Sequence, residues 1–233
     1  MVRSFPGGAF APSVRRMTSS GQAPTKPTLA VLGGTGRTGR LLIDQALVRG
    51  YPLRVLARDP ARLHRRDDAL FALRGDARSR EDVARLLSGA DVVLSTLGPV
   101  RGESSGVMET AARTLVDVMT ELGLTRRITL TGAGVRQPGD RPKLADRLIR
   151  RALATLQADV LRDSEAHVRT VTASPRDWTV VRAPMLRDGP ARPVRAGMVG
   201  DIGPQISRAS VADFMLREVE AGRWIRQAPA ISN

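Results

Sequence analysis

Short apolar runs recur along the chain from residue 28 onward, and segments of helical periodicity separate them. Each run is too short for a helix and is rich in Val, Ile or Leu, which is typical of strands buried on both faces. Strands that alternate with helices predict right-handed crossovers and a parallel sheet covered by helices on both sides. We therefore expect an α/β fold with a doubly wound parallel sheet in a single domain. The predicted strands cover residues 29–32, 53–57, 69–73, 92–94, 128–130 and 178–181.

Helical segments between these runs are marked by their end signals and by apolar faces. The first begins near Arg37 and stops at Gly50, and Ser79 opens the second as part of a capping box that ends at Asp82. The two longest segments have an apolar face that a core could bury. They cover residues 107–122 and 143–157.

Residues 1–27 differ in composition from the rest of the chain. They carry four basic residues, no acidic residue and no apolar periodicity. We expect an unstructured extension here and a domain over residues 28–233. An Arg-rich leader also fits a transit peptide, but the amphipathic face that such a peptide needs is missing. Because no run approaches about 20 apolar residues, we expect no membrane span and a cytoplasmic location.

The composition restricts the chemistry. The chain has no cysteine and only two histidines, so it has no disulfide and no Cys nucleophile, and we expect no metal site. Its net charge is +14, and only Lys26 and Lys143 among its 37 basic residues are lysines. The arginines are spread along the whole chain and aromatic residues make up 3%. Nucleic acid is therefore not the expected partner.

A glycine-rich segment directly after the first predicted strand is the strongest functional signal. Residues 33–39 fit G-x-G-x-x-G and also G-x-x-G-x-x-G. Small residues allow the sharp turn and the close approach of a diphosphate, which the free amides and dipole of the next helix attract. Between a strand and a helix the motif predicts dinucleotide binding, and the alternative is a simple tight turn. The candidate contacts are Gly33, Thr35, Gly36, Arg37, Thr38 and Gly39.

The end of the second predicted strand indicates which dinucleotide binds. Arg58 lies about 20 residues after the motif, where such folds place the side chain that contacts the adenosine ribose. A guanidinium fits a 2′-phosphate, and Arg62 could face the same anion if Pro60 starts a helical turn. We therefore predict NADP(H) as the cofactor. Asp59 keeps NAD open, because its carboxylate could bind the ribose hydroxyls if the strand ended one residue later.

Together these segments resemble the atypical short-chain dehydrogenase/reductase-like proteins, the group of NADPH flavin reductase, biliverdin-IXβ reductase and the NmrA-like proteins. The similarity extends through most of residues 28–233, and its combination of motifs is narrower than the glycine turn alone. The resemblance implies a Rossmann-like fold that binds NAD(P). It rests on residues 33–39, 57–62, 75–77, 95–98 and 178–184.

The resemblance also assigns residues along the coenzyme, some of which have plainer alternatives. Asp76 could satisfy a loop amide, and Leu97 could be ordinary core. The group often has a serine directly after the fifth strand, whereas here Thr131 is followed by Gly132. Whether a hydroxyl orients the substrate or the nicotinamide is therefore open. The resemblance puts Asp76 and Ala77 at the adenine, Leu97 and Gly98 along the coenzyme through main-chain contacts, and Pro184 and Met185 at the nicotinamide.

The chain lacks the Tyr-x-x-x-Lys pair with which the larger reductase branch transfers protons. Its one tyrosine, Tyr51, precedes Pro52 in a predicted loop, and Val55 stands four residues on. The flavin reductase group also lacks the pair, and its hydride transfer depends on positioning the nicotinamide against a flat acceptor. We therefore assign no catalytic residue.

Other candidate residues have ordinary structural interpretations. Residues 102–106 spell G-x-S-x-G, but a loop precedes them, so we expect Ser104 at a helix start rather than on a nucleophile elbow. His167 could act as a general acid near Glu165, but positions two apart on a helix diverge, so a surface histidine is expected. We expect a solvated basic face from Arg147, Arg150 and Arg151.

We expect an NADPH-dependent oxidoreductase that passes hydride to a planar conjugated small molecule, such as a flavin-like or quinone-like acceptor. Residues 132–160 and 183–206 should shape its pocket, because ligands of parallel sheets lie beyond the carboxyl ends of the strands. The alternatives are a non-catalytic NADP(H)-binding redox sensor of NmrA-like type and, third, a nucleic-acid binder. The oligomeric state is not predicted. The arginines expected to line the mouth and favour an anionic acceptor are Arg136, Arg141, Arg187, Arg192 and Arg195.

Overall fold

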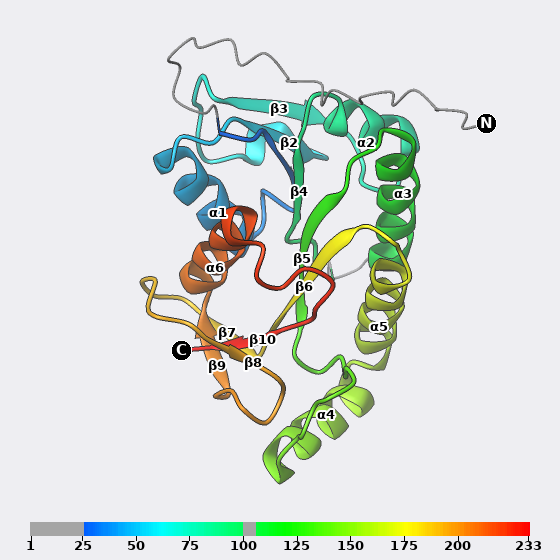
Figure 1. The fold of residues 1–233 in the computed structure, drawn as a ribbon, viewed down its shortest axis with the longest axis vertical. Coiled ribbons are helices and arrows are strands. Elements are labelled where there is room, and N and C mark those ends of the chain that lie inside the picture. The colour runs from blue at the N-terminus through cyan, green and yellow to red at the C-terminus, as the bar shows by residue number, and fades with distance from the viewer. Residues whose placement is uncertain (1–25, 100–105) are drawn as a thin grey trace, which may run out of the picture.

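The computed structural model describes residues 26–99 and 106–233. In this part of the chain, helices pack around one large sheet (Figure 1). All six predicted strands are present, and the fifth and sixth extend two residues beyond the predicted end. The strands are β1 (Leu29–Leu32), β2 (Leu53–Ala57), β3 (Leu70–Arg74), β4 (Val92–Ser95), β5 (Arg126–Gly132), β6 (Asp177–Ala183), β7 (Met185–Arg187), β8 (Arg195–Gly197), β9 (Gln205–Ser207) and β10 (Ala230–Ser232).

Eight of these strands form the main sheet in the order β3-β2-β1-β4-β5-β6-β10-β8. Neighbouring strands pair in parallel except β10 and β8, which are antiparallel. The chain order reverses between β1 and β4, and a cleft at such a switch point is where open parallel sheets bind ligands. The predicted doubly wound parallel sheet is confirmed.

The helices cover both faces of this sheet. Their bounds are α1 (Arg37–Val48), α2 (Arg80–Leu87), α3 (Val107–Glu121), α4 (Leu144–Leu156), α5 (Ala158–Thr172) and α6 (Arg208–Ala221), with a 3₁₀ turn η1 at Pro60–Arg62. Within residues 26–99 and 106–233, none of the helices has the length and apolar character needed to cross a membrane.

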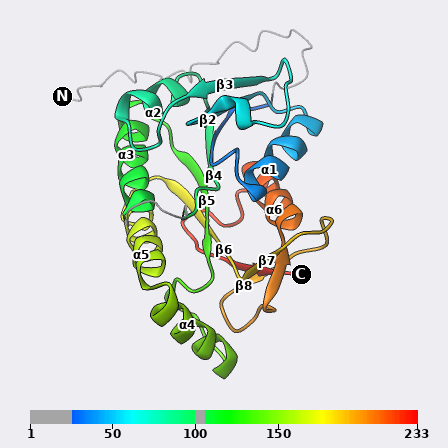
Figure 2. The same ribbon diagram turned by 180° about the vertical axis from the view of Figure 1, so that it is seen from behind.

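The two helical layers follow from the alternation of side chains along each strand. In β1, Leu29 and Val31 join the core cluster that α1 and α6 cover, whereas Ala30 and Leu32 join the cluster under α2 and α3. α5 lies beside α3 in the second layer, as both views of the ribbon show (Figure 2). Burial on both faces explains why these strands read as continuous apolar runs.

The C-terminal third contains elements that the apolar pattern did not predict. β7 and β9 pair in parallel as a separate two-stranded sheet, β10 lies between β6 and β8, and α6 packs beside α1. The strands β7, β8, β9 and β10 have three residues each. A run of that length carries no alternation to read, so its pairing depends on distant parts of the chain.

The starts of α2 and α3 agree with the predicted helical segments. The hydroxyl of Ser79 accepts a hydrogen bond from the amide of Asp82, as expected for the capping box. Ser104 and residues 102–105 of the G-x-S-x-G segment lie outside the described residues. α3 begins only at Val107, and its free amides at positions 108 and 109 donate to the carboxylate of Asp163 at 3.0 and 2.9 Å. The start of α3 is therefore satisfied from α5. The expectation for Ser104 stays a prediction.

The basic face expected on α4 is only partly solvated. Arg147 and Arg151 are exposed, but Arg150 is half-buried and donates to the Glu165 carboxylate on α5 at 2.7 Å. Its Nε also donates to the carbonyl oxygen of Gly134 at 3.2 Å. Arg150 thus ties α4 to α5 and to the loop after β5, which is the physical reason that it leaves the surface.

Candidate functional site

The turn between β1 and α1 leads into a helix start that no side chain caps. Gly33 has a φ of +78°, which favours glycine, and its carbonyl oxygen accepts from the Gly36 amide at 3.0 Å. Gly36 is the N-cap of α1, and no side chain caps the helix and no acid occupies its first turn. The first amides of α1 and the positive end of the helix dipole are therefore available to an anion.

Gly39 holds this turn in shape from inside the helix. A Cβ atom at position 39 would lie 2.1 Å from the carbonyl oxygen of Gly33 and 2.8 Å from the Cα of Gly34. These are backbone atoms that cannot rotate away. Arg40 adds a second restraint, because its Nε donates to the carbonyl oxygen of Thr35 at 3.1 Å. Gly39 therefore shapes the site without lining it.

A cavity of about 860 Å³ extends from this turn along the carboxyl ends of the strands. We call the part of the cavity next to the turn, at the ends of β1 to β4, its proximal half and the remaining part its distal half. The residues of the proximal half are Leu32, Gly33, Thr35, Gly36, Arg37, Thr38, Leu56, Ala57, Arg58, Gly75, Asp76, Ala77, Arg78, Thr96, Leu97, Gly98 and Pro99.

The distal half lies between α3, α5 and the ends of β5 and β6. It is lined by Val107, Met108, Ala111, Leu130, Thr131, Gly132, Gly134, Val135, Gln157, Val160, Leu161, Ser164, Ala183, Pro184, Leu186 and Arg208. Most of these side chains are apolar. The hydroxyl of Thr131 is buried and has no hydrogen-bond partner among the described residues, so it can serve a ligand.

The proximal half carries most of the charge. Arg37, Arg58 and Arg78 line it together with Asp76. Arg78 donates to both carboxylate oxygens of Asp76 from its side chain, at 3.0 and 2.6 Å, and also from its amide at 2.9 Å. Hydrogen bonds from the Arg78 side chain hold the pKa of Asp76 below its usual range. Asp76 therefore does satisfy a loop amide, while it also lines the cavity.

The structure separates Arg58 from Asp59 and Arg62. β2 ends at Ala57, and Arg58 lines the cavity directly after it. Asp59 instead caps η1, where its carboxylate accepts from the Ala61 amide at 3.1 Å. Pro60 does start a helical turn, but Arg62 lies outside the cavity lining, where its carbonyl oxygen accepts from the Arg40 side chain.

The structure separates Pro184 from Met185, the two residues that the resemblance put at the nicotinamide. Pro184 and Leu186 line the cavity, whereas Met185 between them points outward and is 63% exposed. Alternation along β7 explains this difference. None of the five arginines expected at the mouth lines the cavity, namely Arg136, Arg141, Arg187, Arg192 and Arg195. The arginine that does line the distal half, Arg208, was not anticipated.

His167 is buried rather than on the surface, which corrects the sequence-based expectation. It is 4% exposed, with Nδ1 3.2 Å from the carbonyl oxygen of Met108 and Nε2 3.0 Å from the hydroxyl of Thr129. Burial lowers the pKa of His167 to about 4, with a contribution from the charge of Arg127. The imidazole is therefore neutral and structural, and it does not line the cavity.

The burial of His167 predicts acid sensitivity. Its pKa is about 4 in the folded chain and about 6.5 in an unfolded one. Between these values the unfolded state binds the extra proton, so stability is retained above about pH 6.5 and falls by up to about 3 kcal/mol as the pH drops to 4. The free energy of unfolding of His167→Gln, measured in urea, should fall less steeply than that of the wild type between pH 7 and pH 4. His64→Gln is the matched control, and an equal flattening there would contradict the assignment.

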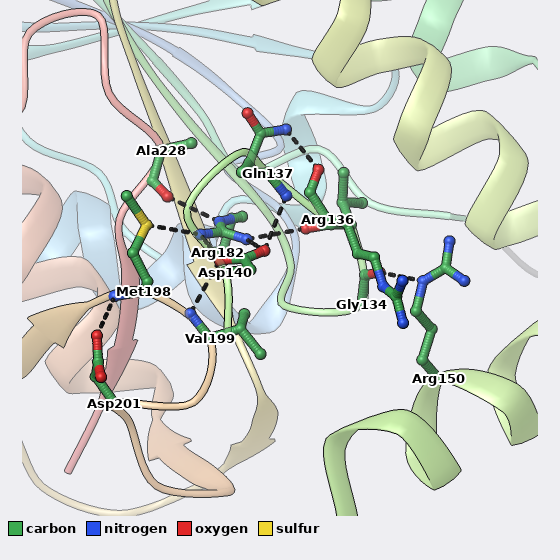
Figure 3. Close-up of polar contacts among 11 residues, drawn as sticks. Gly134, Arg136, Gln137, Asp140, Arg150, Arg182, Met198, Val199, Asp201 and Ala228 are labelled. Atoms are coloured by element: carbon green, nitrogen blue, oxygen red, sulfur yellow. Dashed lines mark hydrogen bonds and ion pairs between the residues drawn. The ribbon is translucent and has the colours of Figure 1, made fainter. Parts of the chain in front are cut away.

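A buried ion pair organises the loops around the distal half (Figure 3). Arg182 on β6 donates to the two carboxylate oxygens of Asp140 at 2.6 and 2.8 Å, and to the carbonyl oxygen of Ala228 at 2.8 Å. Asp140 accepts from the amides of Gln137 and Val199 at 2.8 and 3.0 Å. Burial acts to raise the pKa of Asp140, but the bonds from Arg182 hold it below its usual range. This pair joins the segments after β5 and β8 to β6 and to the chain before β10.

Comparison with known proteins agrees with this geometry. A model of the family described as NAD(P)H-binding matches residues 33–221. The chain belongs to this NAD(P)H-binding family. The matched region starts in the glycine turn and ends with α6, so it contains both halves of the cavity.

Solved structures share the Rossmann-like fold of this family member. The oxidoreductase ylbE of Lactococcus lactis is 19% identical, with a TM-score of 0.75 over 88% of this chain and 90% of its own. A short-chain dehydrogenase/reductase of Veillonella parvula in complex with NADP is 14% identical, with a TM-score of 0.74 over 89% and 94%. ChuY of Escherichia coli O157:H7, an anaerobillin reductase, is 21% identical, with a TM-score of 0.69 over 89% and 97%. At these identities the similarity shows a common fold.

Proposed function

We propose that this NAD(P)H-binding protein is an NADPH-dependent oxidoreductase that reduces a planar conjugated small molecule of the flavin, quinone or bilin type. The observation that carries the proposal is a single cavity that joins the uncapped amides of α1 to an apolar distal half. A dinucleotide that occupied the proximal half would reach the distal half with its other end. The bilin class is included because ChuY, which shares the fold, is an anaerobillin reductase.

The residues of the proximal half fit the coenzyme. The first amides of α1, which no side chain caps, would bind the diphosphate, and Arg58 would bind the 2′-phosphate of the adenosine ribose. Asp76 and Ala77 are assigned to the adenine, and Leu97 and Gly98 to main-chain contacts along the coenzyme. A positively charged proximal half with an open helix N-terminus suits a group that carries several phosphate charges.

The distal half supports reduction by positioning alone. NADPH supplies a hydride from its nicotinamide ring when it is bound, and we assign Pro184 and Thr131 to that ring. The described lining of the distal half offers hydroxyl and amide groups but no pair of titratable side chains. A reaction that needs only a flat acceptor stacked beside the nicotinamide, with its proton taken from water, fits this lining best.

The first test concerns Arg58. Arg58→Ala should weaken NADPH binding by about 10- to 100-fold, the size expected for losing charge-assisted hydrogen bonds, and should leave NADH binding unchanged. Arg62→Ala is a matched control, because it removes the same charge four residues away and outside the cavity lining. Isothermal titration of both variants with NADPH and NADH measures the effect. An equal loss for the two coenzymes, or an equal loss in Arg62→Ala, would refute the role of Arg58.

A second candidate is a sensor that binds NADP(H) without turnover. The absence of a titratable pair from the described lining of the distal half favours it. Steady oxidation of NADPH in the presence of FMN, riboflavin, a quinone or biliverdin would exclude the sensor. Tight NADPH binding without oxidation by any of these acceptors would favour the sensor over the reductase.

A further inference from the structure

Arg208 is the one charged side chain in the described lining of the distal half. It opens α6 directly after the N-cap Ser207, whose hydroxyl accepts from the amide of Ser210 at 3.1 Å. This cap fixes the first turn of the helix and with it the position of Arg208. The residue is only 6% exposed. A charged group in such a place needs an anionic partner.

The partner that the chain itself provides is incomplete. Nη1 of Arg208 donates to the Asp188 carboxylate at 2.7 Å. The side chain of Arg208 is 8% exposed but that of Asp188 is 77% exposed. Nε and Nη2 make no hydrogen bond to any described residue, and neither is among the nitrogen atoms sealed from solvent without a partner. Two of the three guanidinium nitrogens therefore have no partner among the described residues and are not fully sealed from solvent.

The chemistry of the pair favours exchange of Asp188 for a ligand. Asp188 is well hydrated and its attraction to Arg208 is screened by water, so it can turn away at low cost. A guanidinium presents a planar fork that binds a carboxylate or a phosphate through two parallel hydrogen bonds. Apolar residues such as Val160, Leu161 and Leu186 line the same half of the cavity, and an apolar surrounding strengthens such an interaction.

We propose that Arg208 is a specificity-determining residue that binds an acidic substituent, carboxylate or phosphate, on the conjugated acceptor. The inference rests on the proposed function, because it takes the distal half as the acceptor site. Arg208 then selects an anionic acceptor over a neutral one with the same ring system. This selection comes from one buried contact and not from the exposed arginines of the surrounding loops.

Two pairs of acceptors test this role. FMN and riboflavin share a ring system and differ in a phosphate, whereas biliverdin and its dimethyl ester differ in two carboxylates. We expect the NADP⁺-loaded wild type to bind the acidic member of one pair about 10-fold more tightly, measured by flavin fluorescence or bilin absorbance. Arg208→Gln should abolish most of this preference and leave the affinity for the neutral member unchanged. The pair that shows the preference identifies phosphate or carboxylate as the recognised group.

Two further variants separate contact from long-range charge. Arg187→Gln removes the same charge from an exposed position on β7 outside the cavity lining and should keep the preference. Asp188→Asn should strengthen binding of the acidic member, because it releases Arg208. Equal affinities within both pairs, binding of no member of either pair, or an equal loss in Arg187→Gln would overturn the inference. A bound acceptor that does not oxidise NADPH would refute the reductase alone, whereas turnover without a preference would refute Arg208 alone.

Discussion

Replacement of Asp140 by alanine is expected to lower the free energy of unfolding by about 3–5 kcal/mol, the usual cost of leaving a buried charge without its partner. The side chains of Arg182 and Asp140 are 0% and 5% exposed, so water cannot take the place of the carboxylate. The amides of Gln137 and Val199 would lose their acceptor at the same time. Urea unfolding at neutral pH measures the change.

Asp201→Ala is the matched control for this variant. Asp201 is an exposed carboxylate in the same region, and it accepts from the Met198 amide at 3.3 Å (Figure 3). Its loss should cost less than about 1 kcal/mol. The double variant Asp140→Ala/Arg182→Met should recover part of the stability, because it also removes the uncompensated charge. A cost for Asp140→Ala no larger than that for Asp201→Ala would contradict the importance of the pair.

Gly39→Ala is expected to weaken binding of NADPH and NADH alike by about 100-fold, equivalent to about 2.8 kcal/mol. Helix propensity alone predicts that the variant is more stable than the wild type, because alanine favours a helix by about 1 kcal/mol over glycine. The contact outweighs propensity, since the new methyl group would lie 2.1 Å from the Gly33 carbonyl oxygen. That oxygen also accepts from the Gly36 amide, so its displacement disorganises the turn that we propose as the diphosphate site.

The measurement is isothermal titration with both coenzymes, together with urea unfolding. We expect the free energy of unfolding to fall by about 2 kcal/mol through overpacking. Gly203→Ala serves as control, because its added methyl group would meet only the Ser232 side chain at an ordinary 3.5 Å. Gly39→Ala with wild-type coenzyme affinity would exclude the 33–39 turn as the diphosphate site. The equal effect on both coenzymes distinguishes this variant from Arg58→Ala.

The residues of the proximal half could be predicted from the sequence because the motifs that indicate them are local. The turn at residues 33–39 lies within the β1-α1-β2 unit, and Arg58 directly follows this unit. Parallel pairing of β1 with β2 and β4 then brings Arg58 and Leu97 to the same edge as the turn. Short-range pattern and a general rule of sheet topology were sufficient there. Coenzyme binding by the individual residues remains a prediction.

The distal half was not readable because its contacts join distant parts of the chain. Asp140 and Arg182 are 42 residues apart, and nothing next to Asp140 in the sequence marks it as buried. A signal was present at Arg182, since a charge inside the apolar run of β6 requires a buried partner. His167 also stood next to Val168 and one turn from Val171, and these positions lie on one face of a helix, which indicated burial. The sequence around Arg208 gave no signal of burial, because its role depends on where α6 begins.

The position of β10 bears on the order in which the chain folds during synthesis. β8 has β10 as its neighbour in the main sheet, and β10 is made of residues 230–232. On a ribosome, β1 to β6 can pair as they emerge, but β8 must wait until residues 230–232 have been translated. The part of the sheet from β1 to β6 can therefore form while the nascent chain is still growing, and the edge made by β10 and β8 is completed last.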